Sequence, residues 1–340
     1  MAKTVKLADI AEKFGVSVVT VSKALSGQKG VSEEMRERIV SYADELGYVQ
    51  PSVARQREKT VSYNIGVLVR EGYLGEDSFY WKMYRQVAEN AVERGCFSML
   101  EVINTKMEER LMLPKLLTEG KADGIIVIGA LGERYLGKLL KEADAPVVFM
   151  DFNDKKQKSD GVISDSFYGA YRMTNYLIDN GHTRIAYVGT VGATGSITDR
   201  YLGYLKSLIE NGLELREDWI IDDREDENGA IGEGGSLKLP KDMPSAFFCN
   251  CDLTAAILIK KLQKEGYRVP EDISVAGYDD HIYTGMCDVK LTTYAVDVPE
   301  MARQAVSTLI KKVGGERYHK GTHVIEGKIV VRDSVRKKRH

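Results

Sequence analysis

From residue 64 onward, short apolar runs alternate with amphipathic helical segments, and this alternation restricts the possible folds more than any other feature of the chain. Runs such as 64–69 and 124–128 are rich in Ile, Val and Leu, which is typical of strands buried on both faces of a parallel sheet. The alternation therefore predicts an α/β body. We expect strands at 64–69, 96–103, 124–128, 146–150, 184–189, 245–249 and 273–277, and helices at 79–94, 107–119, 136–141, 169–180, 202–211 and 253–265.

The strand–helix pattern runs through two similar series, which are separated by a crossover near Asp160. Two such series predict two doubly wound parallel-sheet lobes. Ligands of open parallel sheets bind at the carboxyl ends of the strands, so a ligand site is expected between the lobes. The predicted lobes comprise roughly residues 62–160 with 290–320, and residues 161–289 with 321–335.

The N-terminal residues 7–25 have the pattern of two short helices around a tight turn. Gly15 can adopt the positive φ that the turn requires, and Ser17 can cap the second helix. Apolar residues recur at i, i+3, i+4 and i+7 on one face of the first helix: Leu7, Ile10, Ala11 and Phe14. The segment predicts an all-α helix-turn-helix head, which would place its second helix in the major groove of DNA. An ordinary helical hairpin is the alternative.

A third helix is expected at 32–46, because Ser32 can cap it and Glu33 and Glu34 lie in its first turn, where the helix dipole favours carboxylates. A polar and basic stretch follows at 48–60. Residues 1–60 carry ten Lys and Arg against eight Asp and Glu, and the whole chain carries 48 against 50. Contact with DNA would therefore depend on a local patch of cations rather than on the net charge.

Three helices, a basic segment and a large α/β body, in this order, resemble the LacI family of transcriptional regulators. The matching segments are VKLADIAEKFGVSVVTVSKALSG, VSEEMRERIVSYADELGY and VARQR, and the resemblance extends over essentially the whole chain. It implies a helix-turn-helix domain at 1–50, a hinge at 51–61, and an effector-binding and dimerisation domain at 62–340 that is like a periplasmic sugar-binding protein. It also implies a sequence-specific repressor that binds double-stranded operator DNA as a homodimer under the control of a carbohydrate or related small polar effector.

By the same resemblance, Val18, Val19 and Lys23 would read the bases of the operator. The valines would favour thymine methyl groups, and Lys23 could donate to guanine. Thr20 and Ser22 would hold phosphates, which sets the register of the protein on the DNA. The implied DNA-binding set is completed by Ser17, Val53, Ala54, Arg55 and Arg57. Arg57 stands where the family usually has a leucine that wedges between base pairs, so the resemblance predicts minor-groove binding without predicting a kink.

Polar side chains follow several predicted strands, at the edge where the ligand is expected. Carboxylates accept hydroxyl groups and an arginine donates to vicinal oxygens, so this set suits a polyhydroxylated ligand. The alternative role of each aspartate is a helix cap, and the alternative role of the aromatic residues after the first strand is packing in the core. The polar candidates, which match the family's sugar-contacting positions, are Asp151, Arg200, Asp252 and Asp279. The aromatic candidates are Phe79, Tyr80 and Trp81.

The chain departs from the family's pattern at two ligand positions. Cys251 stands where an asparagine usually precedes the aspartate of its motif, and residues 222–229 contain no aromatic residue that could stack on a ligand. Both departures predict an effector that is unusually polar, charged or large.

Other chemistries find little support in the sequence. The glycine-rich residues 189–196 lack the lysine of a P-loop, and His182 has no adjacent nucleophile motif, so a ligand-side loop and a structural turn residue are expected. The four cysteines lack metal-like spacing, so neither a metal nor a cofactor is expected. The N-terminus resembles no signal peptide and no run has transmembrane length, which predicts a cytoplasmic protein without a membrane partner.

Two classes of function remain. The first is a DNA-binding repressor that senses a carbohydrate, or alternatively a nucleoside or purine. The second is a cytosolic carbohydrate-binding protein or sugar-acting enzyme with a helical appendage. The chain has no acid–base or nucleophile constellation, which opposes an enzyme. We interpret the chain as the repressor, which salt-dependent retention on DNA would distinguish from the second class.

Overall fold

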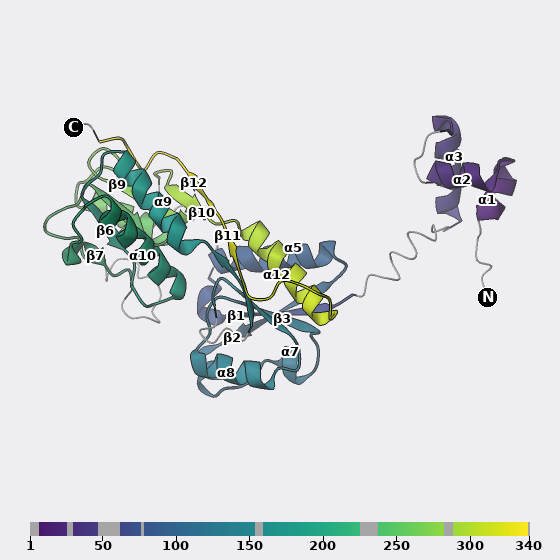
Figure 1. The fold of residues 1–340 in the computed structure, drawn as a ribbon, viewed down its shortest axis with the longest axis horizontal. Coiled ribbons are helices and arrows are strands. Elements are labelled where there is room, and N and C mark those ends of the chain that lie inside the picture. Colours follow the sequence, from purple (N-terminus) through teal and green to yellow (C-terminus); the bar gives the residue numbers. More distant parts are fainter. Residues whose placement is uncertain are drawn as a thin grey trace. The chain divides into compact units, whose positions relative to one another are not determined.

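The computed structural model describes residues 7–25, 30–46, 62–75, 78–153, 159–224, 237–281 and 288–338. The chain divides into two compact units, residues 1–61 and 62–340, and both are drawn in Figure 1.

The first unit contains three short helices, α1 (Leu7–Phe14), α2 (Val18–Leu25) and α3 (Glu33–Glu45). Gly15, between α1 and α2, has a φ of 61°, as the turn prediction required. Arg36 of α3 donates from Nη1 to the carbonyl oxygen of Ala24 at 3.2 Å, which satisfies a free carbonyl at the end of α2. The core of this unit consists of Ile10, Ala11, Val21, Ala24, Ile39 and Ala43. The three predicted helices are confirmed.

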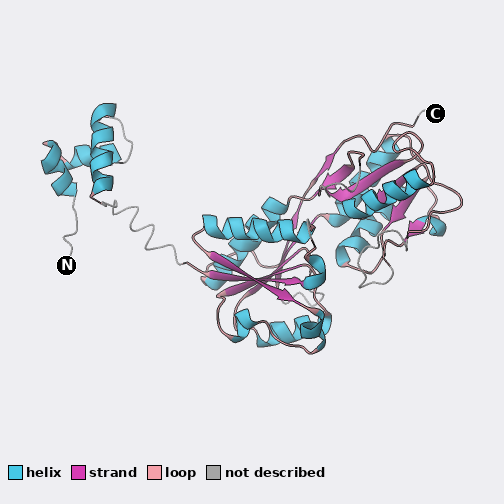
Figure 2. Ribbon diagram, turned by 180° about the vertical axis from the view of Figure 1, so that it is seen from behind, coloured by secondary structure: helices cyan, strands magenta, loops and turns pink. Residues whose placement is uncertain are grey.

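The first lobe of the second unit is a parallel sheet with the strand order β11-β5-β4-β3-β1-β2. Helices α5 (Phe79–Glu93) and α12 (Val298–Val313) cover one face, and α7 (Lys115–Thr118) and α8 (Glu133–Glu142) cover the other (Figures 1 and 2). The strands are β1 (Asn64–Arg70), β2 (Phe97–Ile103), β3 (Gly124–Ile128), β4 (Val147–Met150), β5 (Asp160–Ser164) and β11 (Thr322–Ile325), and two short helices, η1 (Glu71–Tyr73) and α6 (Thr105–Glu109), follow β1 and β2.

The second lobe has the strand order β12-β10-β9-β8-β6-β7, and β12 alone of these strands is antiparallel to its neighbour. Helices α9 (Ser166–Asp179) and α10 (Gly195–Glu210) pack against each other on one face, and α11 (Asp252–Lys264) covers the other. The strands are β6 (Ile185–Val188), β7 (Ile220–Ile221), β8 (Ala246–Cys249), β9 (Ser274–Asp279), β10 (Thr292–Ala295) and β12 (Lys328–Val330), and the short helix η2 (Glu217–Trp219) precedes β7.

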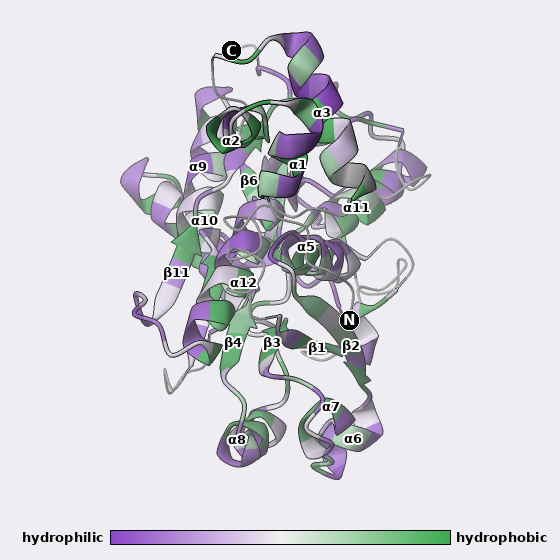
Figure 3. Cartoon of the chain, turned by 90° about the vertical axis from the view of Figure 1, so that its right-hand side faces the viewer, coloured by the Kyte–Doolittle hydropathy of each residue, from purple (hydrophilic) through white to green (hydrophobic). Residues whose placement is uncertain are grey.

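Burial follows the pleat of the strands. In β1, Val67 and Val69 belong to the core beneath α5 and α12, whereas Leu68 belongs to the core beneath α7 and α8. Strand β3 is buried along its whole length, and the strands β1, β3 and β4 are correspondingly hydrophobic in Figure 3. The near-continuous apolar runs therefore became central strands that are covered on both faces.

Several details differ from the sequence-based expectations. Helix α10 begins at Gly195 rather than at 202, and the predicted elements did not include β5, β10, β11, β12 or α12. The predicted helix 107–119 is instead two short helices, because Pro114 lacks an amide hydrogen and begins α7 rather than continuing α6. The lobe boundaries also differ. Strands β5 and β11 pair with each other in the first sheet, and β10 pairs with β9 in the second. The chain thus passes between the sheets after β5, after β10 and after β11, where backbone pairing rather than apolar patterning decides the partner strand.

Among the described helices, none combines the length and the apolar character that crossing a membrane requires.

Candidate ligand-binding site and nucleic-acid interface

Helix α2 presents one face to the core of the first unit and the other to solvent. Val18 and Val19 are 45% and 62% exposed, and Lys23 is also exposed, whereas Val21 and Ala24 are buried. The two exposed valines have no packing role in the described unit. This exposure supports their assignment to a contact surface and remains compatible with the proposed reading of thymine methyl groups.

The start of α2 is held by Ser17. Its Oγ accepts a hydrogen bond from the amide of Thr20 at 3.1 Å and lies 2.9 Å from the Thr20 hydroxyl oxygen. Ser17 thus caps the helix, and both hydroxyl groups are engaged with each other. Ser22 lies half-buried on the same helix. The remaining DNA-binding candidates, Val53, Ala54, Arg55 and Arg57, lie outside the described residues.

In the second unit, Arg200 is the central polar group where the lobes face each other. It is 5% exposed and comes from the second turn of α10. Its Nη1 donates to the carbonyl oxygen of Asn250 at 2.6 Å, its Nη2 lies 3.1 Å from Asp279 Oδ1, and its guanidinium carbon lies 3.8 Å from the centre of the Tyr278 ring. A guanidinium with an ion pair, a hydrogen bond and an aromatic face is rigidly oriented.

Asp151 follows β4 in the first lobe, Asp279 is the last residue of β9 in the second, and both have a positive φ, of 68° and 107°. Such a backbone is costly for a residue with a side chain and occurs most often at functional sites. Burial raises the pKa of Asp151 to about 6 and that of Asp279 to about 7, although the Arg200 charge lowers both. The effect of Arg200 on both carboxyl groups indicates that the three side chains from the two lobes lie close together.

The aromatic candidates divide into three roles. Tyr80 stacks on Tyr73 with ring centroids 4.4 Å apart, and its hydroxyl group partly offsets the rise that burial causes in the pKa of Asp151. Both rings lie against Gly129, where a Cβ would come within 2.7 Å of Tyr73. Phe79 is 7% exposed and packs in the core, and Trp81 is 47% exposed beside Tyr84. Of the three predicted residues, Tyr80 lies beside the aspartate cluster, and Tyr73 is a neighbour that the sequence analysis did not identify.

Two contacts join the lobes beside this cluster. Lys82 Nζ donates to the carbonyl oxygen of Asp280 at 3.5 Å, and the rings of Phe79 and His281 meet edge to face at 6.0 Å. A ligand between the lobes would lie next to these contacts and would bias any relative movement of the lobes.

Asp252 has internal partners for both carboxylate oxygens. Oδ1 accepts from the Thr293 hydroxyl at 2.7 Å, and Oδ2 accepts from the amide of His281 at 2.9 Å. Burial raises its pKa well above the usual value. The carboxyl group therefore holds β10 and the loop after β9 in place, which makes Asp252 a positioning residue in the candidate set. The alternative role as a helix cap belongs instead to Cys251, whose Sγ accepts from the amide of Thr254 at 3.5 Å.

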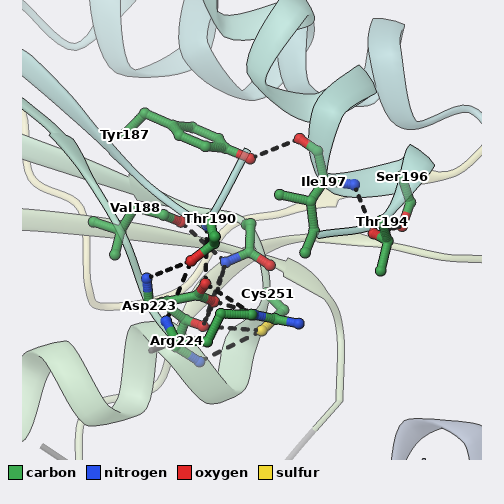
Figure 4. Close-up of polar contacts among 11 residues, drawn as sticks. Tyr187, Val188, Thr190, Thr194, Ser196, Ile197, Asp223, Arg224 and Cys251 are labelled. Carbon is green, nitrogen blue, oxygen red and sulfur yellow. Dashed lines mark hydrogen bonds and ion pairs between the residues drawn. The ribbon is translucent and has the colours of Figure 1, made fainter. Parts of the chain in front are cut away.

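Asp223 is a site residue that the sequence analysis missed (Figure 4). Its carboxylate is fully buried and accepts from the amide of Thr190 at 2.9 Å, the side-chain amide of Asn250 at 2.6 Å and the Thr254 hydroxyl at 2.7 Å. It also pairs with Arg224, whose Nε lies 3.1 Å away. Although burial alone would raise its pKa, these partners hold the pKa below its usual value. The pair of acidic residues directly after β7 was the available signal.

His182 is a structural residue, as predicted. Its Nδ1 lies 3.0 Å from the Ser245 hydroxyl and its Nε2 lies 3.1 Å from the carbonyl oxygen of Arg336. Burial lowers its pKa, which favours the neutral ring. Among the described residues, no group of His, Cys, Asp and Glu side chains is arranged to hold a metal ion.

The raised pKa of Asp151 predicts a pH dependence of stability. Between about pH 4 and pH 6 the folded chain binds this proton more tightly than the unfolded chain, so the contribution of Asp151 to the free energy of unfolding decreases as the pH rises through that range. We therefore expect D151N to gain stability relative to the wild type between about pH 4 and pH 7, as measured by urea unfolding. D179N, which alters an exposed carboxylate on α9, serves as the control. A difference in the free energy of unfolding between D151N and the wild type that stays constant across this pH range would contradict the prediction.

Comparison with known proteins agrees with both units. Residues 6–51 match the family described as bacterial regulatory proteins, lacI family, and residues 174–335 match a periplasmic binding protein-like domain. The chain is 30% identical over 330 residues to the HTH-type transcriptional repressor PurR of Vibrio vulnificus (strain CMCP6), an alignment that covers 97% of this chain and 98% of that protein. The protein of the same name from Vibrio campbellii (strain ATCC BAA-1116) is 29% identical with the same coverage.

Solved structures share the fold at lower identity. The transcriptional regulator CelR–cellobiose complex superposes with a TM-score of 0.69 at 24% identity, over 97% of this chain and 99% of that one. The lac repressor dimer bound to operator and the anti-inducer ONPF superposes with a TM-score of 0.66 at 24% identity, over 98% of this chain and all of that one. Likenesses at this level of identity establish the fold alone.

Proposed function

This chain belongs to the LacI family of DNA-binding transcriptional repressors, and on that premise we propose that its effector is a small polyhydroxylated molecule, such as a carbohydrate, held between the two lobes. The chain is a regulator and not an enzyme. The remaining questions are what the effector is, which residues contact it, and which residues read the operator.

The observation that carries the effector proposal is the cluster of Asp151, Arg200 and Asp279. It draws on both lobes, Arg200 and Asp279 are buried while Asp151 is half-buried, and it combines carboxylate acceptors with a guanidinium donor. Vicinal hydroxyl groups can donate to such carboxylates and accept from such an arginine. Of the aromatic candidates, Tyr80 completes the proposed ligand set, because Phe79 packs in the core and Trp81 is exposed beside Tyr84; Asp252 has a positioning role. No cofactor is part of this proposal.

A nucleoside or purine is the second candidate effector. The stacked rings of Tyr73 and Tyr80, with centroids 4.4 Å apart, favour it because an aromatic face suits a planar base. A thermal-shift screen of the full-length protein separates the two candidates. Stabilisation by neutral mono- or disaccharides would support the first, stabilisation by purine bases or nucleosides would support the second, and no shift from either class would contradict both.

For the operator, we propose that the head at residues 1–50 places α2 in the major groove, with Ser17, Val18, Val19, Thr20, Ser22 and Lys23 at the DNA. The hinge at 51–61 would occupy the minor groove through Val53, Ala54, Arg55 and Arg57. Two chains would join through residues 62–340 and present two heads to a near-palindromic site. Because its proposed target is operator DNA, we propose that the protein acts in the cytoplasm.

The proposed mechanism links the two sites through the lobes. Effector bound at Asp151 in one lobe and Asp279 in the other would change their relative angle and so shift the equilibrium between DNA-competent and incompetent states. A coupling of about 1–3 kcal/mol would change operator affinity about 5–150-fold.

Operator selection tests the DNA-binding part. We expect the wild-type chain to enrich a near-palindromic sequence from a random duplex pool and to lose affinity as salt rises. Enrichment of no sequence above random duplex would contradict the proposal.

The base-reading role of Lys23 gives a sharper prediction. K23A should lose about 1–3 kcal/mol of discrimination at one guanine of the selected site, while its binding to random duplex falls far less. K13A, which removes a cation from the end of α1, is the matched control. An unchanged ranking of operator variants by K23A would count against the assignment.

A further inference from the structure

We propose that the effector carries an anionic group, a carboxylate or a phosphate, and that the guanidinium of Arg224 binds it. The proposal rests on the proposed function, because it assigns ligand chemistry to the same interface between the lobes.

Among the described residues, Arg224 makes its side-chain contacts through one edge of its guanidinium. Its Nε and Nη2 lie 3.1 Å and 3.4 Å from the two oxygens of Asp223, and its side chain is 13% exposed. Within the described part of the chain, Nη1 has no hydrogen-bond partner. A guanidinium presents its donors as a planar fork, so pairing with Asp223 on one side leaves donors on the other side available for a second planar or tetrahedral anion.

The position of this fork is fixed by the groups around Asp223. Asn250, Thr254 and the amide of Thr190 all donate to that carboxylate, and Thr190 Oγ1 in turn accepts from the amides of Asp223 and Arg224 at 3.2 Å and 3.3 Å. Figure 4 shows Arg224 beside Thr190 and Cys251, at the carboxyl ends of β6 and β8. The guanidinium is thus already ordered before an anion binds, so binding does not include the entropic cost of ordering a flexible side chain.

Arg224 also lies within electrostatic reach of the first lobe. Burial raises the pKa of Tyr73, and the charge of Arg224 partly offsets that rise. Burial lowers the pKa of Arg224, but Asp223 and, to a smaller extent, Tyr80 raise it overall. Asn250 links it to the other buried arginine, because the Asn250 carbonyl oxygen accepts from Arg200 while its side chain donates to Asp223. Arg200 Nε is itself buried without a hydrogen-bond partner among the described residues. Two oriented arginines therefore converge on the region between the lobes.

Most carboxylates near the proposed anion site already have a cation or hydrogen-bond donor within the protein, so they do not prevent a further negative charge from binding. Asp279 pairs with Arg200, Asp223 pairs with Arg224, and both oxygens of Asp252 accept from groups within the second lobe. Asp151 then serves as an acceptor for ligand hydroxyl groups, and Arg224 serves as a donor to the anion. A molecule that combines both features is a polyhydroxylated acid or a phosphate ester. Residues 222–229 are polar and contain no aromatic residue where the family usually has one, which agrees with this ligand chemistry.

Inorganic phosphate is the simplest probe of the anion site. The thermal unfolding temperature of the full-length protein would be measured in sodium phosphate and in sodium chloride of equal ionic strength. We expect phosphate to raise the Tm of the wild type above its value in chloride, and R224Q to lose most of this rise because glutamine keeps a donor for Asp223 without the charge. R268Q, which removes an exposed ion-paired arginine of the same lobe, should respond as the wild type does.

Two other results of the phosphate measurement would overturn the proposal. An equal rise in R224Q and the wild type would mean that phosphate binds elsewhere as an adventitious ion only, and no rise in the wild type would mean that the fork binds no anion. If R224Q does not fold, R224K, which keeps the charge without the fork, replaces it and should lose part of the rise. An unchanged rise in R224K would then count against recognition by the fork.

The phosphate measurement and operator selection report on different claims. Enrichment of an operator by the wild type tests the proposed function, whereas the phosphate response of R224Q against R268Q tests Arg224 alone. Binding of D-glucose with no preference for D-glucuronate or D-glucose 6-phosphate would preserve the polyhydroxylated effector and reject the anionic group.

Discussion

Replacing Asp223 by alanine is expected to lower the free energy of unfolding by about 3–5 kcal/mol. The carboxylate is fully buried and satisfies the amide of Thr190, the side chains of Asn250 and Thr254, and the charge of Arg224. Alanine would leave these donors without their acceptor and the cation without its counter-charge, in a region largely closed to water. Urea unfolding at neutral pH would measure the loss.

Two comparisons make the Asp223 prediction specific. D222A removes the adjacent carboxylate, which is exposed, and should change stability by less than about 0.5 kcal/mol. The pKa of Asp223 is held below its usual value, so its contribution is present at neutral pH and is lost as the pH falls through the folded-state pKa. The difference in the free energy of unfolding between D223A and the wild type should therefore become smaller at acidic pH. Equal stability of D223A and D222A at neutral pH would contradict this account.

The second large effect is expected from Arg200. In R200A the cluster loses the ion pair with Asp279, the hydrogen bond to Asn250 and the cation beneath Tyr278. If the effector binds through this guanidinium, the effector-dependent change in operator affinity should fall from about 5–150-fold to less than about twofold. Titration of the selected operator with R200A, with and without a ligand found by the screen, would measure the change.

The matched control for R200A is K206A, which removes an exposed cation of the same helix. K206A should retain the effector response. R200A should still bind operator without effector, because the proposed operator contacts belong to the head and hinge. An effector-dependent change in operator affinity that is as large in R200A as in the wild type would refute the assignment of this residue.

The order of the elements could be read directly from the chain. The apolar runs at 64–69 and 124–128 and the helical pattern at 7–25 depend on spacings within a single element, which are local properties. Asp151 and Asp279 lie near strand ends that the apolar pattern had located, whereas Arg200 lies in the second turn of α10, which begins seven residues before the predicted start at 202. The assignment of these three residues to the ligand remains a prediction. The break in the predicted helix 107–119 could also have been predicted from the sequence, because proline disrupts the interior of a helix.

The hydrogen bonds between side chains that are distant in the sequence could not be predicted from the sequence. Asp223 bonds with Thr190, Asn250 and Thr254, which are 27 to 33 positions away, and Asp252 bonds with Thr293, 41 positions away. These bonds depend on the order and register of β6, β8, β9 and β10, which are set by many backbone pairings at once. Local pattern thus specified many of the elements and the family, whereas long-range pairing decided which carboxylates have hydrogen-bond partners within the protein.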